Sequence, residues 1–208
     1  MTYEQAINAV VNGFEYPLWE IIGHYKLKGI EFSLEDTIID IGTNVGHFSI
    51  VAARKGAGRI IGYEISEQSY NQALINCKDY SQIEIHNLGV WSSNGVIKYN
   101  SWEEGHQTLS VLKGGNKEIK CISLDSILEP LDKVRFLKVD CEGSEYEILM
   151  NSKLLSRVEQ IAIEVHIIEG TPDPKELKEY LEKSGFKVKH CLTGNPGLSF
   201  MYVKNKGK

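Results

Sequence analysis

The chain has 208 residues, a formal net charge of −5 and a pI near 5.7. This length suits one α/β domain of ordinary size and is too short for two, so we expect a single domain over residues 1–208. Enzymes that bind polyanions are more often basic, so the acidic balance argues against nucleic acid as a partner. No apolar run approaches the ~18 residues that a membrane span requires.

The N-terminal sequence MTYEQAINAVVNG lacks the basic start and apolar block of a signal peptide. The cysteines are widely separated and form no C-x-x-C pair, which favours free thiols in a reducing compartment over a metal site. We therefore expect a cytoplasmic protein. Residues 1–35 read mainly as helix, over 3–11 and 18–27, and we expect an N-terminal helical cap that packs on the core or helps to line an acceptor pocket.

Residues 37–64 read as strand, glycine-rich turn, helix and strand. Gly42 and Gly46 enclose the turn, so the backbone can approach a ligand, and the helix that follows offers its N–H groups. Glu64 stands 24 positions after Asp40, where a carboxylate can bind both hydroxyls of a ribose. The pattern predicts a site for a cofactor that contains a nucleoside.

The spacing of this turn differs from the dinucleotide fingerprint G-x-G-x-x-G. Here it is D-x-G-x-x-x-G, with Asn44 where the second glycine would stand. That glycine admits a pyrophosphate, which S-adenosylmethionine does not have. The turn therefore favours S-adenosylmethionine over NAD, although a plain strand–helix turn with a structural glycine would read similarly.

The remaining chain continues the alternation of strands and helices. Ser66 is positioned to cap a helix that runs to about Tyr80, and Asp173-Pro174 with Glu176 forms the start of a later helix that Gly185 ends. The polar stretch 100–116 predicts an extended loop, which we interpret as a lid. The predicted strands after residue 80 are 83–88, 96–99, 117–122, 134–139, 160–165, 186–191 and 198–203, and a short helix is expected over 143–150.

The last two strands are too close together for a helical crossover, so they should pair antiparallel. A parallel α/β sheet that ends in an antiparallel hairpin resembles the ground plan of Rossmann-like methyltransferases, so we predict an α/β fold of that type. Its seven-stranded sheet would be mostly parallel, with a C-terminal antiparallel hairpin, and residues 36–208 would form the core.

Three sequence blocks resemble the FkbM-type family of S-adenosylmethionine-dependent methyltransferases. They are D-I-G-T-N-V-G-H-F-S at 40–49, L-K-V-D-C-E-G-S-E-Y-E-I-L at 137–149 and the weaker I-E-V-H at 163–166. The segment 119–128 also resembles the one that precedes the fourth strand in that family. The resemblance covers roughly residues 36–170. Thr43 departs from the alanine that is frequent in the family, and both residues are small.

The resemblance implies where the cofactor would bind. The turn would face the methionine end, with Thr43 and Asn44 bonded to its carboxylate, while Glu64 would hold the ribose and Ile65 would pack on the adenine. Asn87, Leu88 and Gly89 would meet the adenine from the other side. Asp140 ends the fourth strand, at the mouth of the cleft where open α/β sheets bind ligands. The implied cofactor residues are Asp40, Gly42, Thr43, Asn44, Gly46, Glu64, Ile65, Asn87, Leu88, Gly89 and Asp140.

Methyl transfer to an alcohol requires in-line placement of the nucleophile and a group that accepts its proton. The catalytic candidates are Asp140, Glu142, Glu164 and His166, at the ends of the fourth and fifth strands. Glu164 and His166 are two apart on a strand and share a face, so His166 could be the base. Glu142 and Glu145 could instead stabilise the N-terminus of the next helix.

A divalent metal is a further alternative, because Asp140 and Glu164 stand at places similar to those of the magnesium-binding acids in catechol O-methyltransferase-like enzymes, and Mg²⁺ prefers oxygen ligands. The third ligand of that arrangement is not evident here, and we do not favour a metal. The family implies O-methylation of a hydroxyl, here on a small molecule, a glycan or a lipid-linked sugar. The alternatives are an RNA methyltransferase, or a protein that binds S-adenosylmethionine without catalysis.

Overall fold

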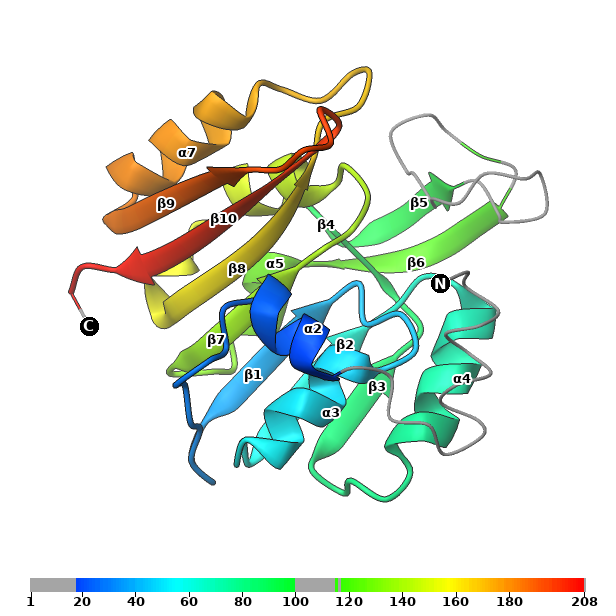
Figure 1. Cartoon of the computed structure of the whole chain (residues 1–208). Coiled ribbons are helices and arrows are strands. Elements are labelled where there is room, and N and C mark those ends of the chain that lie inside the picture. Colours follow the sequence, from blue (N-terminus) through cyan, green and yellow to red (C-terminus); the bar gives the residue numbers. More distant parts are fainter. Residues whose placement is uncertain (1–17, 100–114, 116, 208) are drawn as a thin grey trace. The chain divides into compact units, whose positions relative to one another are not determined.

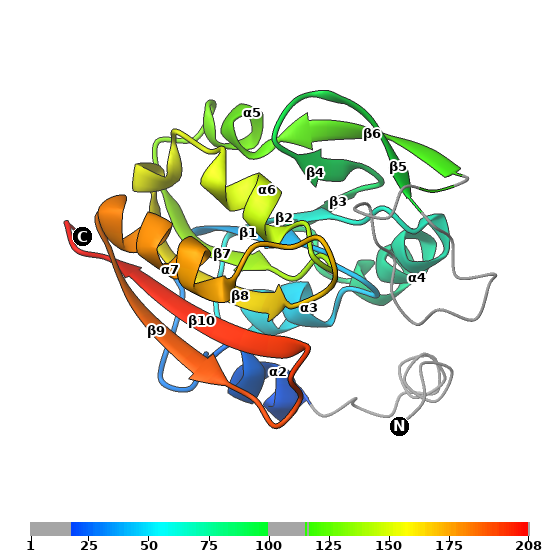
Figure 2. The ribbon, with the colours of Figure 1, turned by 90° about the horizontal axis from the view of Figure 1, so that it is seen from above.

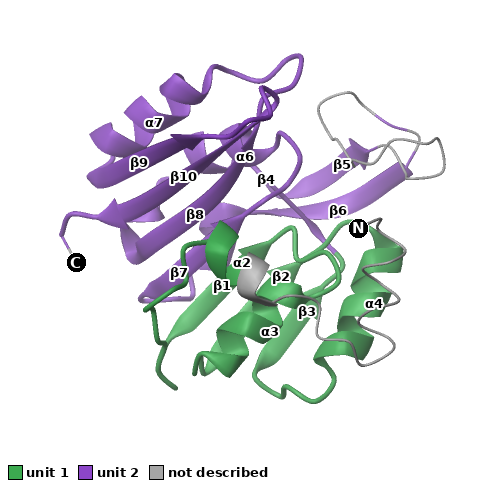
Figure 3. Cartoon of the chain, in the orientation of Figure 1, with its two compact units in different colours: residues 1–87 green, residues 88–208 purple. Residues whose placement is uncertain are grey.

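The computed structural model describes residues 18–99, 115 and 117–207 (Figure 1). The predicted helix over 3–11 and nearly all of the predicted lid over 100–116 lie outside the described residues. The chain divides into two compact units, residues 1–87 and residues 88–208 (Figure 3).

Seven strands form one sheet in the order β3 (Ile83–His86), β2 (Arg59–Tyr63), β1 (Thr37–Ile41), β7 (Val134–Val139), β8 (Val158–His166), β10 (Leu198–Asn205) and β9 (Phe186–Leu192). The pairs β1–β2, β2–β3 and β7–β8 are parallel, whereas β10 is antiparallel to both β8 and β9. The predicted mostly parallel sheet with a C-terminal antiparallel hairpin is therefore confirmed. None of the described helices is long and apolar enough to cross a membrane.

The unit of residues 1–87 is built around three short strands and the helix α3. Strands β1 and β2 are buried at four of their five residues each, as their apolar sequences predict, whereas β3 buries only Ile85; α3 buries six of its eight residues. Ser66 caps α4 as predicted: its hydroxyl accepts a hydrogen bond from the Ser69 N–H at 3.3 Å. The elements are α2 (Leu18–His24), β1 (Thr37–Ile41), α3 (His47–Arg54), β2 (Arg59–Tyr63), α4 (Glu67–Cys77) and β3 (Ile83–His86).

Aromatic and aliphatic contacts hold these elements together. Tyr25, which follows α2, packs edge-to-face on Phe48 of α3 with ring centroids 5.3 Å apart. On the other flank Ile50, Ala73 and Cys77 form a buried cluster with Ile85, so α3, α4 and β3 share one core.

The unit of residues 88–208 contains the other four strands of the large sheet. It also has a three-stranded sheet in the order β4-β6-β5, where β4 is parallel to β6 and β5 antiparallel to it. Its elements are β4 (Gly89–Trp91), β5 (Gly95–Tyr99), β6 (Lys117–Ser123), α5 (Leu124–Leu128), β7 (Val134–Val139), α6 (Glu145–Met150), a 3₁₀ turn (Leu155–Arg157), β8 (Val158–His166), α7 (Pro174–Lys183), β9 (Phe186–Leu192) and β10 (Leu198–Asn205).

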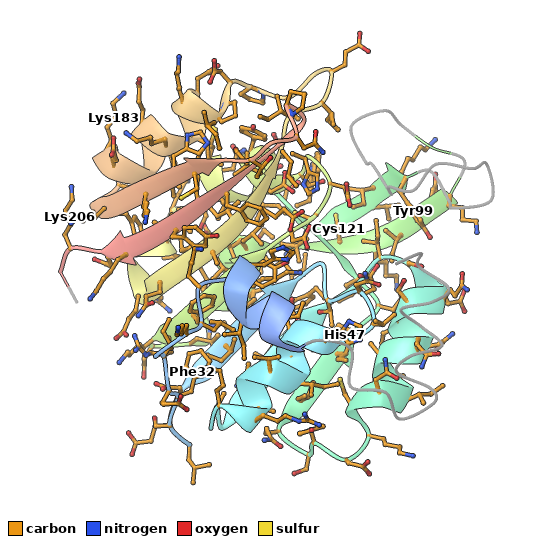
Figure 4. All side chains as sticks on the ribbon, in the orientation of Figure 1. Phe32, His47, Tyr99, Cys121, Lys183 and Lys206 are labelled. Carbon is orange, nitrogen blue, oxygen red and sulfur yellow. The ribbon has the colours of Figure 1, made fainter. Side chains whose placement is uncertain are left out.

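Figure 2 shows α6 and α7 side by side, and they contact β8 and β9 respectively. Asp173 caps α7 in the predicted capping box, with Glu176 as its reciprocal partner and Pro174 at the first helical position. Tyr99 and Cys121 are buried side chains of the smaller sheet (Figure 4). Within this unit β7 and β8 pair in parallel, so their carboxyl ends lie next to each other.

Candidate functional site

The first candidate region is the turn of residues 42–46, called here the glycine turn, with the glutamate that ends β2. Gly42 has φ 75° and Asn44 has φ 52°, so the chain turns back through left-handed backbone. Glu64 holds this path: its Oε2 accepts the Asn44 N–H at 2.7 Å and its Oε1 accepts the Ser66 N–H at 2.8 Å. Glu64 is therefore the residue that shapes the turn.

Glu64 is 7% exposed and its carboxylate bridges two backbone segments. A carboxylate can accept about four hydrogen bonds, so two backbone donors are compatible with ribose hydroxyls as further donors. The side-chain amide of Asn87 donates to the carbonyls of Glu64 and Ile65 at 2.8 and 3.2 Å. These bonds bring three of the predicted cofactor residues, Glu64, Ile65 and Asn87, together at the end of β2.

Asp40 lies beneath the glycine turn and has no exposed surface. Its Oδ2 accepts the hydroxyl of Ser49 on α3 at 2.7 Å, and its carbonyl accepts the hydroxyl of Thr43 at 2.9 Å. These contacts tie β1, the turn and the first turns of α3 together. Direct contact of Asp40 or Thr43 with a cofactor stays a prediction.

Gly46 has a structural reason to be glycine that the sequence did not reveal. Its φ is 91°, and a Cβ atom there would lie 2.6 Å from the sulfur of Cys77 on α4. The lack of a side chain thus allows α3 and α4 to approach, independently of any ligand. His47 follows it at the start of α3 (Figure 4), and burial lowers its pKa to about 4, so it is neutral near pH 7.

The second candidate region is the turn of residues 140–144, called here the acidic turn, which follows β7. Glu142 has φ 55° and Gly143 has φ 98°. Glu145, the first residue of α6, closes the turn: its carboxylate accepts the Cys141 N–H at 3.0 Å and the Gly143 N–H at 2.9 Å. Glu145 has no exposed surface.

His166 ends β8 and lies between two carboxylates of the acidic turn. Its Nδ1 is 2.9 Å from Glu145 Oε1, and its Nε2 is 3.3 Å from Glu142 Oε2. Burial lowers the pKa of His166, but the hydrogen bond and charge of Glu145, together with Glu142 and Asp140, raise it overall to about 9. His166 is therefore a cation near pH 7.

Two acids near His166, Glu142 and Glu164, have raised pKa values. Burial raises the pKa of Glu142 to about 7, against the opposing effect of His166, and burial together with Asp140 raises the pKa of Glu164 to about 8. Burial, with Glu145 next, also raises the pKa of the Cys141 thiol well above its usual value, which disfavours a nucleophilic thiolate.

The structure thus brings the predicted catalytic residues of strands β7 and β8 into one group, called here the β7–β8 cluster. Single ligand atoms of Asp140, Glu164 and His166 all lie within 4.8 Å of one another. Lys138 of β7 is buried, with its Nζ 3.5 Å from Asp140 Oδ2. The cluster consists of Asp140, Glu142, Glu145, Glu164 and His166.

From the sequence, Glu145 is one of the acids at this strand end, but it was not chosen as a catalytic candidate, because an acid at the start of a helix also reads as a stabilising first-turn charge. The signal that could have found it is the spacing E-G-x-E after a buried strand. Perturbed pKa values in one half-buried group of side chains are typical of functional sites.

A model of the methyltransferase FkbM domain matches residues 40–188. This span contains both the glycine turn and the β7–β8 cluster. The sequence comparison with curated proteins finds no match.

Solved structures of methyltransferases have the same fold. Magnesium protoporphyrin IX methyltransferase from Synechocystis, described with bound SAM, matches with a TM-score of 0.56 and 12% identity over 99% of this chain and 85% of its own. TrmK of M. capricolum, in complex with S-adenosyl-homocysteine, matches with a TM-score of 0.55 and 15% identity over 93% of this chain and 69% of its own. An rRNA methylase from Streptococcus thermophilus matches with a TM-score of 0.56 and 12% identity over 88% of this chain and 94% of its own. At these identities the likeness concerns the fold alone.

Proposed function

The chain belongs to the FkbM family of S-adenosylmethionine-dependent methyltransferases, and we propose that it methylates a hydroxyl group of a small molecule, a glycan or a lipid-linked sugar. The observation that carries this proposal is the β7–β8 cluster. An alcohol loses its proton when it takes up a methyl group, so a hydroxyl acceptor needs a proton-accepting group beside the reacting oxygen. The cluster offers several.

S-adenosylmethionine supplies a methyl group on a positively charged sulfur. We assign its binding to the glycine turn and Glu64, whose carboxylate can accept the ribose hydroxyls while it keeps its two backbone donors. The remaining assigned contacts are those implied by the family resemblance. The bound SAM and S-adenosyl-homocysteine of the Synechocystis and M. capricolum proteins support this choice of cofactor.

Glu142 fits the role of proton acceptor best. Its pKa of about 7 is near the pH at which a general base is most effective, and its side chain is one-third exposed, at 32%. When bound, S-adenosylmethionine would supply the methyl group and keep the electron pair of its carbon–sulfur bond, and Glu142 would take the proton that the acceptor hydroxyl loses. His166, with a pKa of about 9, is less well suited to be the base that the sequence predicts.

The acceptor class is tested by incubating the full chain with S-adenosylmethionine that carries a deuterated methyl group. Fractions of small molecules, glycolipids and RNA are offered separately, and products are identified by mass spectrometry. We expect the label on a hydroxyl oxygen outside the RNA fraction. Glu142→Gln should lose the label, while Glu169→Gln, an exposed acid beyond the cluster, should keep it.

Two outcomes would contradict the proposal. Label confined to RNA would make the chain an RNA methyltransferase. No label in any fraction, together with a melting temperature still raised by S-adenosylmethionine, would make it a cofactor-binding protein without catalysis.

A further inference from the structure

The carboxyl ends of β7 and β8 bring two carboxylates and one imidazole to a single point. Their ligand atoms lie within 4.8 Å of one another, and these groups are common protein ligands of divalent cations. We propose that Asp140, Glu164 and His166 together bind one divalent metal ion, which binds the hydroxyl oxygen of the acceptor. The role in methyl transfer rests on the proposed function, whereas the metal site does not.

The orientation of His166 supports the site. Its Nδ1 is hydrogen-bonded to Glu145 Oε1 at 2.9 Å, and Glu145 is itself fixed by two backbone N–H groups. A carboxylate on one ring nitrogen fixes the imidazole so that the other nitrogen can bind a metal, as it does for most metal-bound histidines. Glu145 therefore holds Nε2 of His166 ready as the ligand atom.

The charge of the cluster supports the site independently. Asp140, Glu142, Glu145 and Glu164 are four carboxylates within one group, and the described part of this unit places one lysine against them, with Lys138 Nζ 3.5 Å from Asp140 Oδ2. Carboxylates this close together repel one another when they are ionised, and a cation bound between them compensates for that repulsion. Beside the positive charge of Lys138, a divalent ion held by Asp140, Glu164 and His166 would supply two further positive charges at this point.

The three ligands are each partly exposed, so an ion and an acceptor oxygen can reach them. A divalent cation lowers the pKa of a bound hydroxyl and so eases the loss of its proton. Glu142 lies 3.3 Å from His166 Nε2 and is not among the three ligands, so it can take that proton. The metal site and Glu142 thus have complementary roles.

The mixed ligand set indicates which ion to use as a probe. Ca²⁺ and Mg²⁺ prefer oxygen ligands throughout, whereas imidazole suits first-row transition metals. Mn²⁺ accepts carboxylates and imidazole, and its unbound form is measured directly by electron paramagnetic resonance. We therefore choose MnCl₂.

The test uses the full chain without an affinity tag, treated with EDTA and then titrated with MnCl₂. We expect one Mn²⁺ bound per chain, with affinity reduced at least ~10-fold by Asp140→Asn, Glu164→Gln or His166→Ala. Glu169→Gln removes a similar charge three residues after His166 and should bind as the parent does. In the unmodified protein, Mn²⁺ should also broaden the ring NMR signals of His166, a readout that does not depend on the folding of a variant.

The proposal is wrong if the unmodified chain binds no Mn²⁺, or if Asp140→Asn and Glu169→Gln bind Mn²⁺ equally well. Failure of the metal site differs from failure of the proposed function. Hydroxyl methylation that persists unchanged in EDTA would overturn the metal role alone. Mn²⁺ binding at His166 without methylation of any hydroxyl acceptor would overturn the function and leave the site.

Discussion

The glycine turn and the acidic turn follow the same plan with different chemistry. Each follows a buried parallel strand, contains a non-glycine residue with positive φ (Asn44 or Glu142), and is closed by a buried glutamate that accepts two backbone N–H groups. The partners of those glutamates differ. Glu64 accepts only backbone groups among the hydrogen bonds described above, whereas Glu145 also holds the imidazole of His166. The same turn plan therefore surrounds a carboxylate with backbone donors in one case and joins a carboxylate to an imidazole in the other.

The largest expected effect is on the rate of methylation, which should depend on the acidic turn through Glu142. Glu142→Gln should lower the rate ~10²–10⁴-fold, the scale for loss of a general base, because the amide cannot accept the hydroxyl proton. Affinity for S-adenosyl-homocysteine should be nearly unchanged, as measured by calorimetry. Full turnover in this variant would remove Glu142 from the proton transfer and end the chemical contrast between the turns.

The next effect compares the two closing glutamates by stability. Glu145→Gln leaves His166 and two N–H groups without their anionic partner in a buried position, which costs ~3–5 kcal/mol of unfolding free energy. Glu64→Gln should cost less, about 1–3 kcal/mol, because the two bonds described for Glu64 come from backbone N–H groups and not from a charged imidazole. Urea unfolding of both variants measures the difference. Equal losses would show that His166 adds nothing to the hold of Glu145.

A smaller effect concerns cofactor binding. Glu64→Ala should weaken S-adenosyl-homocysteine by ~1–3 kcal/mol, the scale for loss of charge-assisted hydrogen bonds. NAD should bind neither the parent nor the variant. If Glu145→Ala weakened the cofactor as strongly as Glu64→Ala, the assignment of binding to the glycine turn would have to be abandoned.

The smallest effect compares the two residues with positive φ. Asparagine tolerates the left-handed region far better than glutamate, so Asn44→Gly should change the unfolding free energy little. Glu142→Gly should raise it by about 1 kcal/mol, because it relieves backbone strain, while turnover is lost with the carboxylate. Thermal unfolding with a turnover assay checks both. A stabilising effect of equal size at both positions would place the strain in the backbone path, whatever the side chain.

The sequence was sufficient for the parts of the fold that local patterns determine. Strand β7 was predicted with its observed limits, and the caps at Ser66 and Asp173 follow directly from residue type and spacing. The three-residue strand β4 and the helix α5 were not predicted, because segments so short carry no periodic pattern.

The candidate site shows a similar division. The convergence of Glu164 and His166 with Asp140 follows from adjacent parallel strands, so strand order was enough to predict it. The role of Glu145 depends on a hydrogen bond between residues 21 positions apart, and the need for glycine at 46 depends on the sulfur of Cys77 on another helix. Both are tertiary contacts, and no local pattern encodes them.

The strand β9 is the outer strand of the seven-stranded sheet, and its sequence has a consequence for the behaviour of the protein at high concentration. An outer strand presents unpaired backbone groups to which another chain can add a strand. Lys187 and Lys189 alternate along β9 as exposed side chains. A strand from a second copy that paired there would bring like charges together, so these lysines protect the sheet from edge-to-edge aggregation.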